Sequence, residues 1–228
     1  MNLSTLYQYI SVCILGLGLL AVGSASAGAS TIDWATWSSN TAGAISGLGI
    51  TVSYSGQLNG LSSGYPSWTP ITTFSGGTVG NPPSSAGGMI RLTGGGTTVD
   101  TITFSTSVVN PVLAIWSLGQ PSINANFTFT ANEPFTIESG GPSAEFGGSS
   151  IFVCAGNPLA VCGAEGNGTV QFNGTFSSIS WTNPVFENYY GFTVGAAGIS
   201  TTPEPGTLLL LGTGILGLAG AVRRKLQV

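Results

Sequence analysis

Several short stretches of the chain alternate apolar and polar residues, which is the pattern of a β-strand with one buried face. Three sets of apolar positions show it most clearly: Ile50, Val52 and Tyr54; Ile123, Ala125, Phe127 and Phe129; and Tyr190, Phe192 and Val194. Weaker strand candidates are residues 32–34, 71–74, 89–92, 99–104, 112–118, 151–153, 170–172 and 176–181. Because no stretch between residues 28 and 202 has sustained helical periodicity, the pattern predicts an all-β domain.

Turn-forming residues separate the predicted strands, for example at Gly94-Gly95-Gly96. Asn173-Gly174, between two apolar stretches, predicts a hairpin turn, whose two central residues take positive φ. About ten short strands, with turns at intervals of about 8–12 residues, predict a two-sheet sandwich or jelly roll over residues 28–200, with Ser and Thr on its outer face. The longest loops are expected at residues 38–48 and 75–88.

The first 27 residues have the pattern of a secretory signal peptide, whose apolar part would form a short helix. An apolar stretch over 10–22 is followed by the small residues Ala25-Ser26-Ala27, which predicts cleavage before Gly28. The first nine residues carry no Lys or Arg, unlike a typical leader, and the alternative is a buried N-terminal helix. Cys13 lies within the apolar stretch and is expected to leave with the leader.

The last 28 residues, 201–228, combine three features. Pro203-Glu204-Pro205 is expected to be extended and accessible, because each proline fixes its own φ and disfavours helix at the preceding residue. Residues 207–222 are uncharged and would form a helix of about 24 Å, a thin transmembrane segment against a hydrocarbon core of about 30 Å. Arg223, Arg224 and Lys225 would hold the end of that helix in the cytoplasm. The alternative is a core helix, but the segment lacks a polar stripe.

Composition excludes several classes of function. Between Ala27 and Pro203 one base, Arg91, stands against seven acids, so the net charge of this span is −6 and nucleic-acid binding is excluded. The chain has no histidine, which removes Ser-His-Asp and Cys-His catalysis and most transition-metal sites. A pair of carboxylates among Asp100, Glu138, Glu165 and Glu187 could support glycosidase chemistry, but solvated loops or turns are the expected positions. The chain is therefore not expected to be an enzyme.

Cys154 and Cys162 are the cysteines that remain after removal of the leader. In an oxidising compartment they are expected to form a disulfide. The alternatives are a zinc or a redox site, but no histidine and no further thiol would complete a zinc shell.

Two segments are candidates for ligand binding. Residues 163–169 place Glu165 and Asn167 among glycines, where oxygen atoms could converge on Ca²⁺, although one Glu is few for that ion; the alternative is a polar turn. Residues 183–192 place Glu187, Asn188 and Tyr189 among aromatic residues, a combination that suits a sugar ring; the alternative is a core strand. No other cofactor and no other metal site is expected.

The order of Pro203-Glu204-Pro205, a Gly-rich apolar helix and a terminal Arg/Lys cluster, over about residues 202–225, resembles the PEP-CTERM sorting signal. The resemblance implies recognition by an exosortase, a membrane transpeptidase of Gram-negative bacteria that is usually found beside exopolysaccharide-producing systems. It thus implies an exported, membrane-anchored precursor that ends at the cell surface or in the extracellular matrix, with exosortase, membrane and exopolysaccharide as partners.

Three hypotheses describe the folded domain. The first is a structural or adhesive surface protein that is associated with exopolysaccharide. The second is a carbohydrate-binding module of jelly-roll type. The third is an ice-binding surface, for which Thr97, Thr98, Thr101, Thr103 and Thr106 supply threonine but no regular ladder along the chain.

Overall fold

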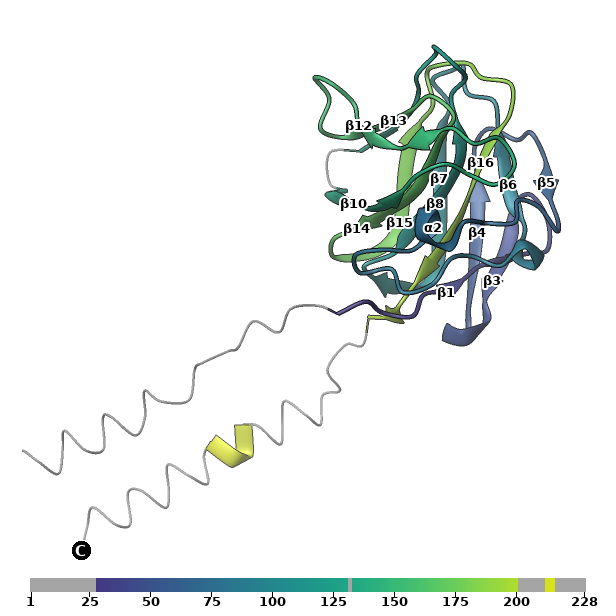
Figure 1. The fold of residues 1–228 in the computed structure, drawn as a ribbon. Helices are drawn as coiled ribbons and strands as arrows, with labels where there is room; N and C mark the ends of the chain where they lie inside the picture. The colour runs from purple at the N-terminus through teal and green to yellow at the C-terminus, as the bar shows by residue number, and fades with distance from the viewer. Residues whose placement is uncertain (1–27, 131–132, 201–211, 216–228) are drawn as a thin grey trace, which may run out of the picture.

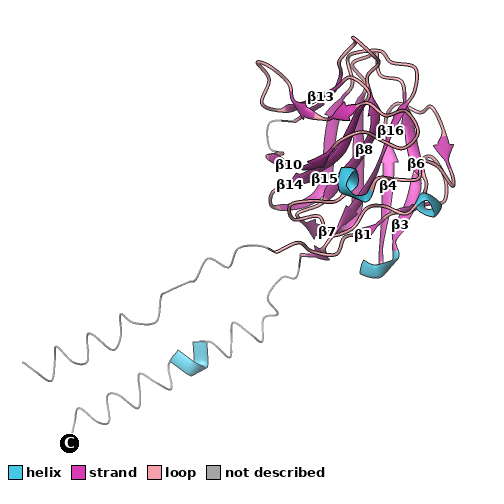
Figure 2. Ribbon diagram, in the orientation of Figure 1, coloured by secondary structure: helices cyan, strands magenta, loops and turns pink. Residues whose placement is uncertain are grey.

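The structure is a computed structural model that describes residues 28–130, 133–200 and 212–215 (Figure 1). The predicted leader, Pro203-Glu204-Pro205, the basic cluster and most of the predicted transmembrane helix lie outside these residues. Residues 212–215 are helical and exposed. In the part of the chain that is described, no helix is long and apolar enough to cross a membrane. The domain over 28–200 consists mainly of strands, with helical turns only in the connections (Figure 2).

The first of two antiparallel sheets, sheet I, packs across the core from the second, sheet II. The neighbouring strands of sheet I are, in order, β10 (Phe135–Gly140), β14 (Gly166–Phe172), β8 (Val112–Leu118), β16 (Tyr190–Ala196), β6 (Met89–Leu92) and β5 (Leu61–Ser62). β1 (Asp33–Trp34) pairs with β16, and β11 (Ser149–Ser150) adds to β14 as a parallel strand.

Sheet II lies on the other side of the core. Its neighbouring strands are, in order, β12 (Phe152–Val153), β13 (Ala160–Gly163), β9 (Ala125–Phe129), β15 (Thr175–Thr182), β7 (Val99–Val109), β4 (Ile50–Ser55), β3 (Ala42–Ile45) and β2 (Thr36–Trp37). A last short strand, β17 (Gly198–Ile199), pairs with β7.

The order of the central strands is that of a jelly roll. Sheet I contains the run β14-β8-β16-β6, and sheet II contains the run β13-β9-β15-β7. The chain passes to the opposite sheet from β6 to β7, from β7 to β8 and from β8 to β9, and it alternates again from β13 to β16. Strands that are neighbours in sequence therefore face each other across the core, as in the double-sheet jelly rolls. The predicted all-β, two-sheet domain is confirmed.

Aromatic rings fill the core between the sheets. On β4 the inward residues are buried and the outward ones exposed, as the alternation predicts. Trp181 of β15 contacts Phe192 of β16 edge to face at 5.1 Å between ring centroids, and Phe127 of β9 lies 5.5 Å from Trp181. Such contacts add to the burial of large apolar area. The two sheets are thus joined through rings from each of them.

Sheet I is covered on its outer face as well. β8, β14 and β16 are buried at every position. The alternation of residues 190–194 therefore does not distinguish a buried face from a solvent-exposed one. The cover is the connection from β5 to β6, which includes the short helices α2 (Ile71–Phe74) and η2 (Ser85–Gly87). Trp68 and Phe74 of this cover pack on Met89, Ala114 and Trp116 of the sheet.

The outer face of sheet II is open and carries hydroxyl groups, as predicted. The register aligns Ser53, Thr103 and Ser178 across β4, β7 and β15, and it aligns Ser55, Thr101 and Ser180 in the next row. These side chains are exposed or half-buried. The rows run across the strands, so the ladder of hydroxyls is not visible as a repeat along the chain.

Two predictions of local structure were wrong. Residues 71–74 form the helix α2 after Pro70 instead of a strand, because Phe74 packs on the outer face of sheet I and is not part of a ladder. Residues 38–48 are not a long loop: they contain β3 and the helical turn η1 (Ser46–Leu48), and β3 pairs with β2 and β4. The other expected loop, 75–88, contains only η2.

The predicted hairpin at Asn173-Gly174 was also wrong. The two flanking strands, β14 and β15, lie in different sheets, so the turn carries the chain across the sandwich. Gly174 has φ 137°, whereas Asn173 is not among the residues with positive φ. Asn110 in the β7–β8 connection holds the turn: its amide donates to the Gly174 carbonyl, and its Oδ1 accepts from the Gly174 amide, both at 2.8 Å.

Asp100 is an acidic group inside the core. It is 1% exposed, and its Oδ1 accepts hydrogen bonds from the Tyr54 hydroxyl at 2.5 Å and from the Gln57 amide at 2.7 Å. Burial raises the pKa of the Asp100 carboxyl despite these two bonds, which act in the opposite direction.

The raised pKa of Asp100 makes stability depend on pH. A carboxyl whose pKa is higher in the folded than in the unfolded chain stabilises the fold while protonated, and this stability is lost as the pH rises through the folded pKa. Asp100→Asn retains an oxygen that can accept both bonds and cannot ionise. We expect the free energy of unfolding of the variant, relative to the parent, to increase from about pH 3 to about pH 7 in urea denaturation series. A difference that is constant over this range would contradict the raised pKa.

Candidate functional site

The ends of β8, β14 and β16 gather several of the predicted site residues at one end of sheet I. The register places Leu118 of β8 beside Gly166 of β14, and Trp116 of β8 beside Gly191 of β16. At the opposite end, β1 pairs with the last residues of β16, where the described chain begins and the domain finishes (Figure 1). The site described below therefore lies at the end of the sandwich that is remote from residues 28 and 200, the first and last of the described domain.

Glu165 and Ser117 form the first contact of this site. The Ser117 hydroxyl donates to Glu165 Oε2 at 2.6 Å. Both residues have left-handed backbones, with φ 57° for Ser117 and φ 54° for Glu165, which non-glycine residues seldom adopt. At this point the ladder between β8 and β14 shifts by one residue. The irregular backbone turns the hydroxyl of Ser117 toward the carboxylate of Glu165.

Asn167 holds the surrounding loops together. It is 1% exposed; its Oδ1 accepts from the Ser117 amide at 2.8 Å, and its Nδ2 lies within 3.0–3.3 Å of the carbonyl oxygens of Gly141, Gly147 and Glu165. Both hydrogens of the side-chain amide therefore have acceptors within the protein. Asn167 therefore stabilises the turn at Glu165 through hydrogen bonds to the neighbouring loops.

Glu187 is the second carboxylate of the site. It is 3% exposed, and its Oε1 accepts from the Tyr189 amide at 2.6 Å, while its Oε2 is buried without a hydrogen-bond partner. Burial raises the pKa of the Glu187 carboxyl to about 7, and the charge of Glu165 raises it as well, against the amides of Tyr189, Gly119 and Asn188, which lower it. The effect of burial on the Glu187 carboxyl thus outweighs that of the three backbone amides that favour its charged form.

An aromatic cluster borders the two carboxylates. Trp116 is fully buried at its centre, with the rings of Tyr65 and Phe146 at 5.1 Å and that of Tyr189 at 5.6 Å. Trp116 Nε1 donates to Glu145 Oε2 at 3.1 Å. Phe146 is 54% exposed and Tyr189 half-buried, so part of the cluster faces solvent.

Tyr189 connects this cluster to the one base of the domain. The Arg91 guanidinium lies over the Tyr189 ring, 5.6 Å from its centroid. The Tyr189 hydroxyl is 3.0 Å from Ser62 Oγ. Asn188, beside it in sequence, is exposed. Of the residues that the sequence singled out, Glu165, Asn167, Glu187 and Tyr189 therefore lie in one region around the end of β8, with Asn188 at its surface.

The other carboxylates considered in the sequence lie elsewhere. Glu138 on β10 accepts from the Thr78 amide at 2.8 Å, and Asp100 lies in the core. Ser117, Trp116 and Glu145 belong to the site but were not identified from the sequence; Trp116 and Ser117 lie in the strand over 112–118, which has the pattern of an apolar core strand. In the described parts of the chain, no group of three or more His, Cys, Asp or Glu side chains is placed to hold a metal ion.

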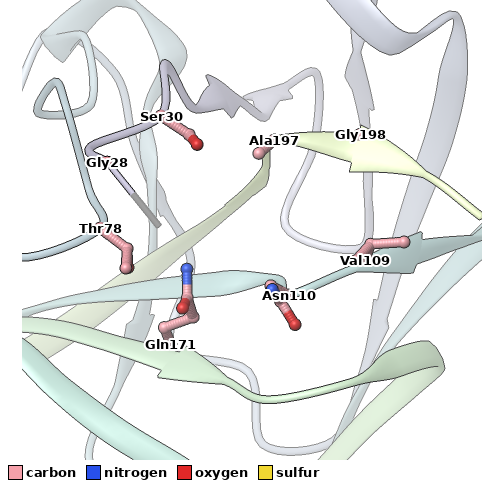
Figure 3. A pocket seen from close by; sticks show the side chains of 8 residues that line it. All are labelled: Gly28, Ser30, Thr78, Val109, Asn110, Gln171, Ala197 and Gly198. Atoms are coloured by element: carbon pink, nitrogen blue, oxygen red, sulfur yellow. The ribbon is translucent and has the colours of Figure 1, made fainter. Parts of the chain in front are cut away.

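A separate cavity of about 290 Å³ lies at the opposite end, near the beginning of the described chain (Figure 3). Its lining consists of Gly28, Ser30, Thr78, Val109, Asn110, Gln171, Ala197 and Gly198. These residues are uncharged and none is aromatic, so the cavity offers neither acid–base chemistry nor a stacking surface. A shallow groove on the outer face of β2, β3 and β4 is likewise lined by small and hydroxyl residues.

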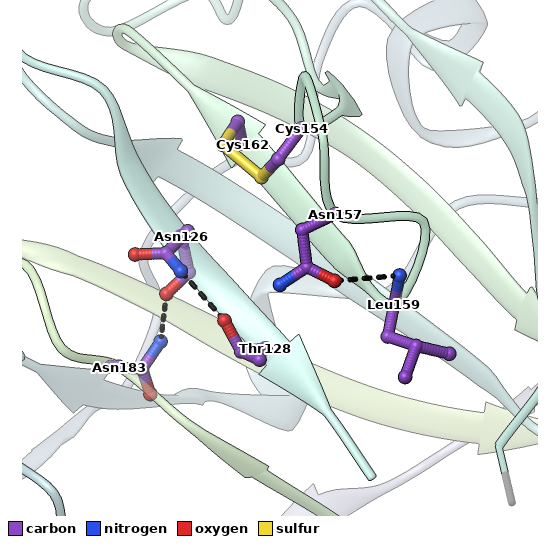
Figure 4. The surroundings of a disulfide bond; sticks show 7 residues. All are labelled: Asn126, Thr128, Cys154, Asn157, Leu159, Cys162 and Asn183. Atoms are coloured by element: carbon purple, nitrogen blue, oxygen red, sulfur yellow. Dashed lines mark hydrogen bonds between the residues drawn. A yellow bond between two sulfur atoms is a disulfide. The ribbon is translucent and has the colours of Figure 1, made fainter. Parts of the chain in front are cut away.

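The predicted disulfide is confirmed. Cys154 and Cys162 are joined with an S–S distance of 2.05 Å, which ties the edge strand β12 to β13 (Figure 4). Within the closed loop, Asn157 Oδ1 accepts from the Leu159 amide at 3.1 Å, and the Cys154 amide donates to the Ala160 carbonyl. The bond thus fixes a short exposed edge that would otherwise have only two ladder residues.

Comparison with known proteins identifies one segment. Residues 201–225 match the family model of the PEP-CTERM protein-sorting motif, so the chain carries this motif directly after the jelly roll. The motif supports an exported, surface-directed protein that is processed by exosortase. No curated protein and no solved structure matches the chain.

The disulfide should stabilise the fold mainly by reducing the conformational entropy of the unfolded chain. For so short a loop the chain-entropy model gives about 2–3 kcal/mol. We expect the double variant Cys154→Ser, Cys162→Ser to lose about this much free energy of unfolding in urea, measured without reductant. Addition of reductant should destabilise the parent and leave the variant unchanged. Equal urea midpoints for both proteins without reductant would show that the bond contributes nothing.

Proposed function

We propose that this chain, as the carrier of a PEP-CTERM protein-sorting motif, is an exported precursor whose jelly-roll domain is displayed at the cell surface or in the extracellular matrix. There it acts as a structural or adhesive component that is associated with exopolysaccharide. The observation that carries the proposal is the direct succession of domain and motif. The Ser200 amide donates to the Ser107 carbonyl at 2.7 Å, and the motif begins at residue 201.

The positions of the two chain ends support the route of export. Ser30 bridges to Val79, and β17 pairs with β7, so the entry to the domain and its exit are held at the same end of the sandwich. In the proposed precursor, residues 1–27 are the signal peptide and residues 207–222 the transmembrane helix. Both would approach the membrane from the same end of the domain without unfolding it.

We propose a role without catalysis. The chain has no histidine, and the two carboxylates that lie together are a poor acid–base pair, because Glu187 is 3% exposed. The open face of sheet II instead carries uncharged hydroxyls, which can exchange hydrogen bonds with the hydroxyls of a polysaccharide without the cost of desolvating a charge. Such contacts suit a matrix component that binds a polysaccharide chain through many weak contacts.

A specific observation also favours the second function, a carbohydrate-binding module. The aromatic cluster presents Phe146 and part of Tyr189 to solvent, with Glu145 and Asn188 beside them. Exposed rings next to polar groups are a usual combination in ligand sites. On this proposal the sugar would stack on Phe146 at the end of the domain remote from the motif.

Removal of residues 203–228 should abolish sorting. We expect the truncated protein in the medium or the periplasm and not in the surface fraction, as measured by immunoblots of cell fractions. The matched control removes only residues 226–228, which lie behind the motif, and should be displayed normally. Unchanged surface display of the longer truncation would refute the sorting role.

Retention on polysaccharide tests the role of the domain. We expect the full chain to be retained on exopolysaccharide from the same organism in a pulldown. Phe146→Ala should weaken retention about tenfold if the aromatic cluster is the binding site, which corresponds to about 1.4 kcal/mol. Phe186→Ala removes another exposed ring, outside the cluster, and should have no effect. Failure of the parent protein to bind any fraction of the polysaccharide would contradict both forms of the proposal.

A further inference from the structure

The one base of the domain has no hydrogen-bonding partner. Arg91 is half-buried on β6, and its Nε is buried without an acceptor. Within residues 28–130, 133–200 and 212–215, its guanidinium neither donates a hydrogen bond nor forms an ion pair, and it contacts the ring of Tyr189. A buried donor without an acceptor costs free energy, and charged side chains are seldom buried unless they are paired. Such a group in a native fold points to an acceptor from outside the described chain.

Arg91 lies in line with the aromatic cluster on the outer face of sheet I. The register places Gly191 of β16 directly between Arg91 of β6 and Trp116 of β8. Residues that are directly opposite each other on neighbouring strands share a face of the sheet. Because Trp116 packs in the outer cluster with Met89, the Arg91 side chain also lies on the outer face, away from the core between the sheets.

Two neighbours hold the guanidinium at this place. Its carbon Cζ lies 5.6 Å from the centroid of the Tyr189 ring, a distance at which the ring attracts a cation. A Cβ at Gly60 would lie 2.5 Å from Arg91 Nη2, so the glycine leaves the room that the guanidinium occupies. The Tyr189 hydroxyl is 3.0 Å from Ser62 Oγ, which fixes the ring beside the cation.

The acids of the site are used within the protein. Glu145 Oε1 accepts from the Ser67 amide at 2.8 Å, and its Oε2 accepts from the Trp116 indole at 3.1 Å. Glu187 is 3% exposed. The seven acids of the domain all lie in the described residues, and none forms an ion pair with Arg91. The charge of Arg91 is thus left for an anion that comes from solution.

We infer that this surface recognises the carboxylate of an acidic sugar, a uronic acid residue within a polysaccharide. The inference rests on the second of the proposed functions, the carbohydrate-binding module, and names the class of sugar that it would take. A guanidinium offers two parallel N–H donors to the two oxygens of a carboxylate. Nη1 and Nη2 of Arg91 would supply them, because Nε is buried. The sugar ring would lie on the exposed part of the aromatic cluster, which Tyr189 joins to Arg91.

The surroundings favour a sugar with single, spaced charges over a denser anion. One base balances one carboxylate, whereas the net charge of −6 between Ala27 and Pro203 repels a polyphosphate. At physiological ionic strength the Debye length is about 8 Å, so exposed acids that lie farther away act only weakly on an anion at Arg91. Phe146, which is 54% exposed, and the half-buried Tyr189 suit the face of a sugar ring better than an acidic peptide side chain.

Carboxyl reduction of the polysaccharide tests the inference. Carbodiimide activation followed by borohydride converts the carboxylates of uronic acids to neutral primary alcohols and leaves the sugar chain in place. We expect the full chain in detergent to bind reduced exopolysaccharide about tenfold or more weakly than native exopolysaccharide from the same organism, in pulldowns at about 0.15 M salt. Poly-L-glutamate at the same carboxylate concentration should not displace the protein from the native material.

The outcomes separate this inference from the proposed function. Equal binding to both materials would overturn the preference for an acidic sugar and leave the carbohydrate-binding function in place. Displacement by poly-L-glutamate would also overturn it, because charge alone would then be recognised. Binding to neither material would contradict the inference together with the function on which it rests.

Matched variants locate the preference. Arg91→Gln should weaken binding to native polysaccharide about tenfold or more and leave binding to the reduced material unchanged, so that the preference disappears. Arg91→Lys keeps the charge but not the paired donors and should retain only part of the preference. Thr175→Asp changes the net charge by the same amount as Arg91→Gln and should keep the full preference. Thr175 is exposed and pairs with Val109, which lines the cavity at the opposite end of the sandwich.

The ratio of binding to native and reduced polysaccharide decides the result, because a merely structural role of Arg91 would weaken both alike. If Arg91→Gln keeps the ratio of the parent, the inference is wrong. Should Arg91→Gln not fold, as judged by its Tm, Arg91→Lys supplies the same comparison.

Discussion

The burial of sheet I on both faces is the constraint on which the rest of the domain depends. A sheet with two dry faces needs a second apolar layer, and the β5–β6 connection supplies it with Trp68 and Phe74. Glycines in the covered strand β16 leave room for the side chains beside it. A Cβ at Gly191 would meet the Met89 side chain at 2.6 Å, and one at Gly195 would meet the Ile32 side chain at 2.6 Å. The glycine content of the chain thus has a packing reason within strands as well as in turns.

Because the domain has only one base, its acidic residues share a structural role other than ion pairing. Most of them accept hydrogen bonds from backbone amides or hydroxyls of another segment: Asp100 from Gln57, Glu133 from Ser180, Glu138 from Thr78, Glu145 from Ser67, and Glu165 from Ser117. Each carboxylate fastens one connection to another without an ion pair. Glu187 departs from this rule because the amide that donates to its Oε1, that of Tyr189, belongs to the same segment.

Sequence patterns were sufficient to predict a strand where the residues of the segment itself determine its conformation. The strands at 89–92 and 112–118 have the predicted bounds, and 50–55 shows the predicted alternation. The prediction failed where the conformation of a segment depends on the elements that pack against it in the fold. Phe74 is apolar because it covers a sheet, not because it belongs to one, and Asn173-Gly174 has the composition of a hairpin although its flanking strands belong to different sheets. Local residues cannot distinguish these cases.

The candidate site shows the same limit. Glu165, Asn167, Glu187 and Tyr189 were identified from local composition, but their proximity depends on the order of β14, β8 and β16 in the sheet. Ser117 could not be found in this way, because its left-handed backbone arises from a shift in the ladder. Asn167 was identified for its oxygen atom, whereas the structure uses its amide hydrogens to join three loops.

The hydrogen bond of Ser200 to Ser107 holds the chain against β7 up to the residue before the sorting motif. The hydrogen-bonded part of the chain thus ends where the motif begins, so cleavage within the motif would leave every backbone hydrogen bond described in the domain in place.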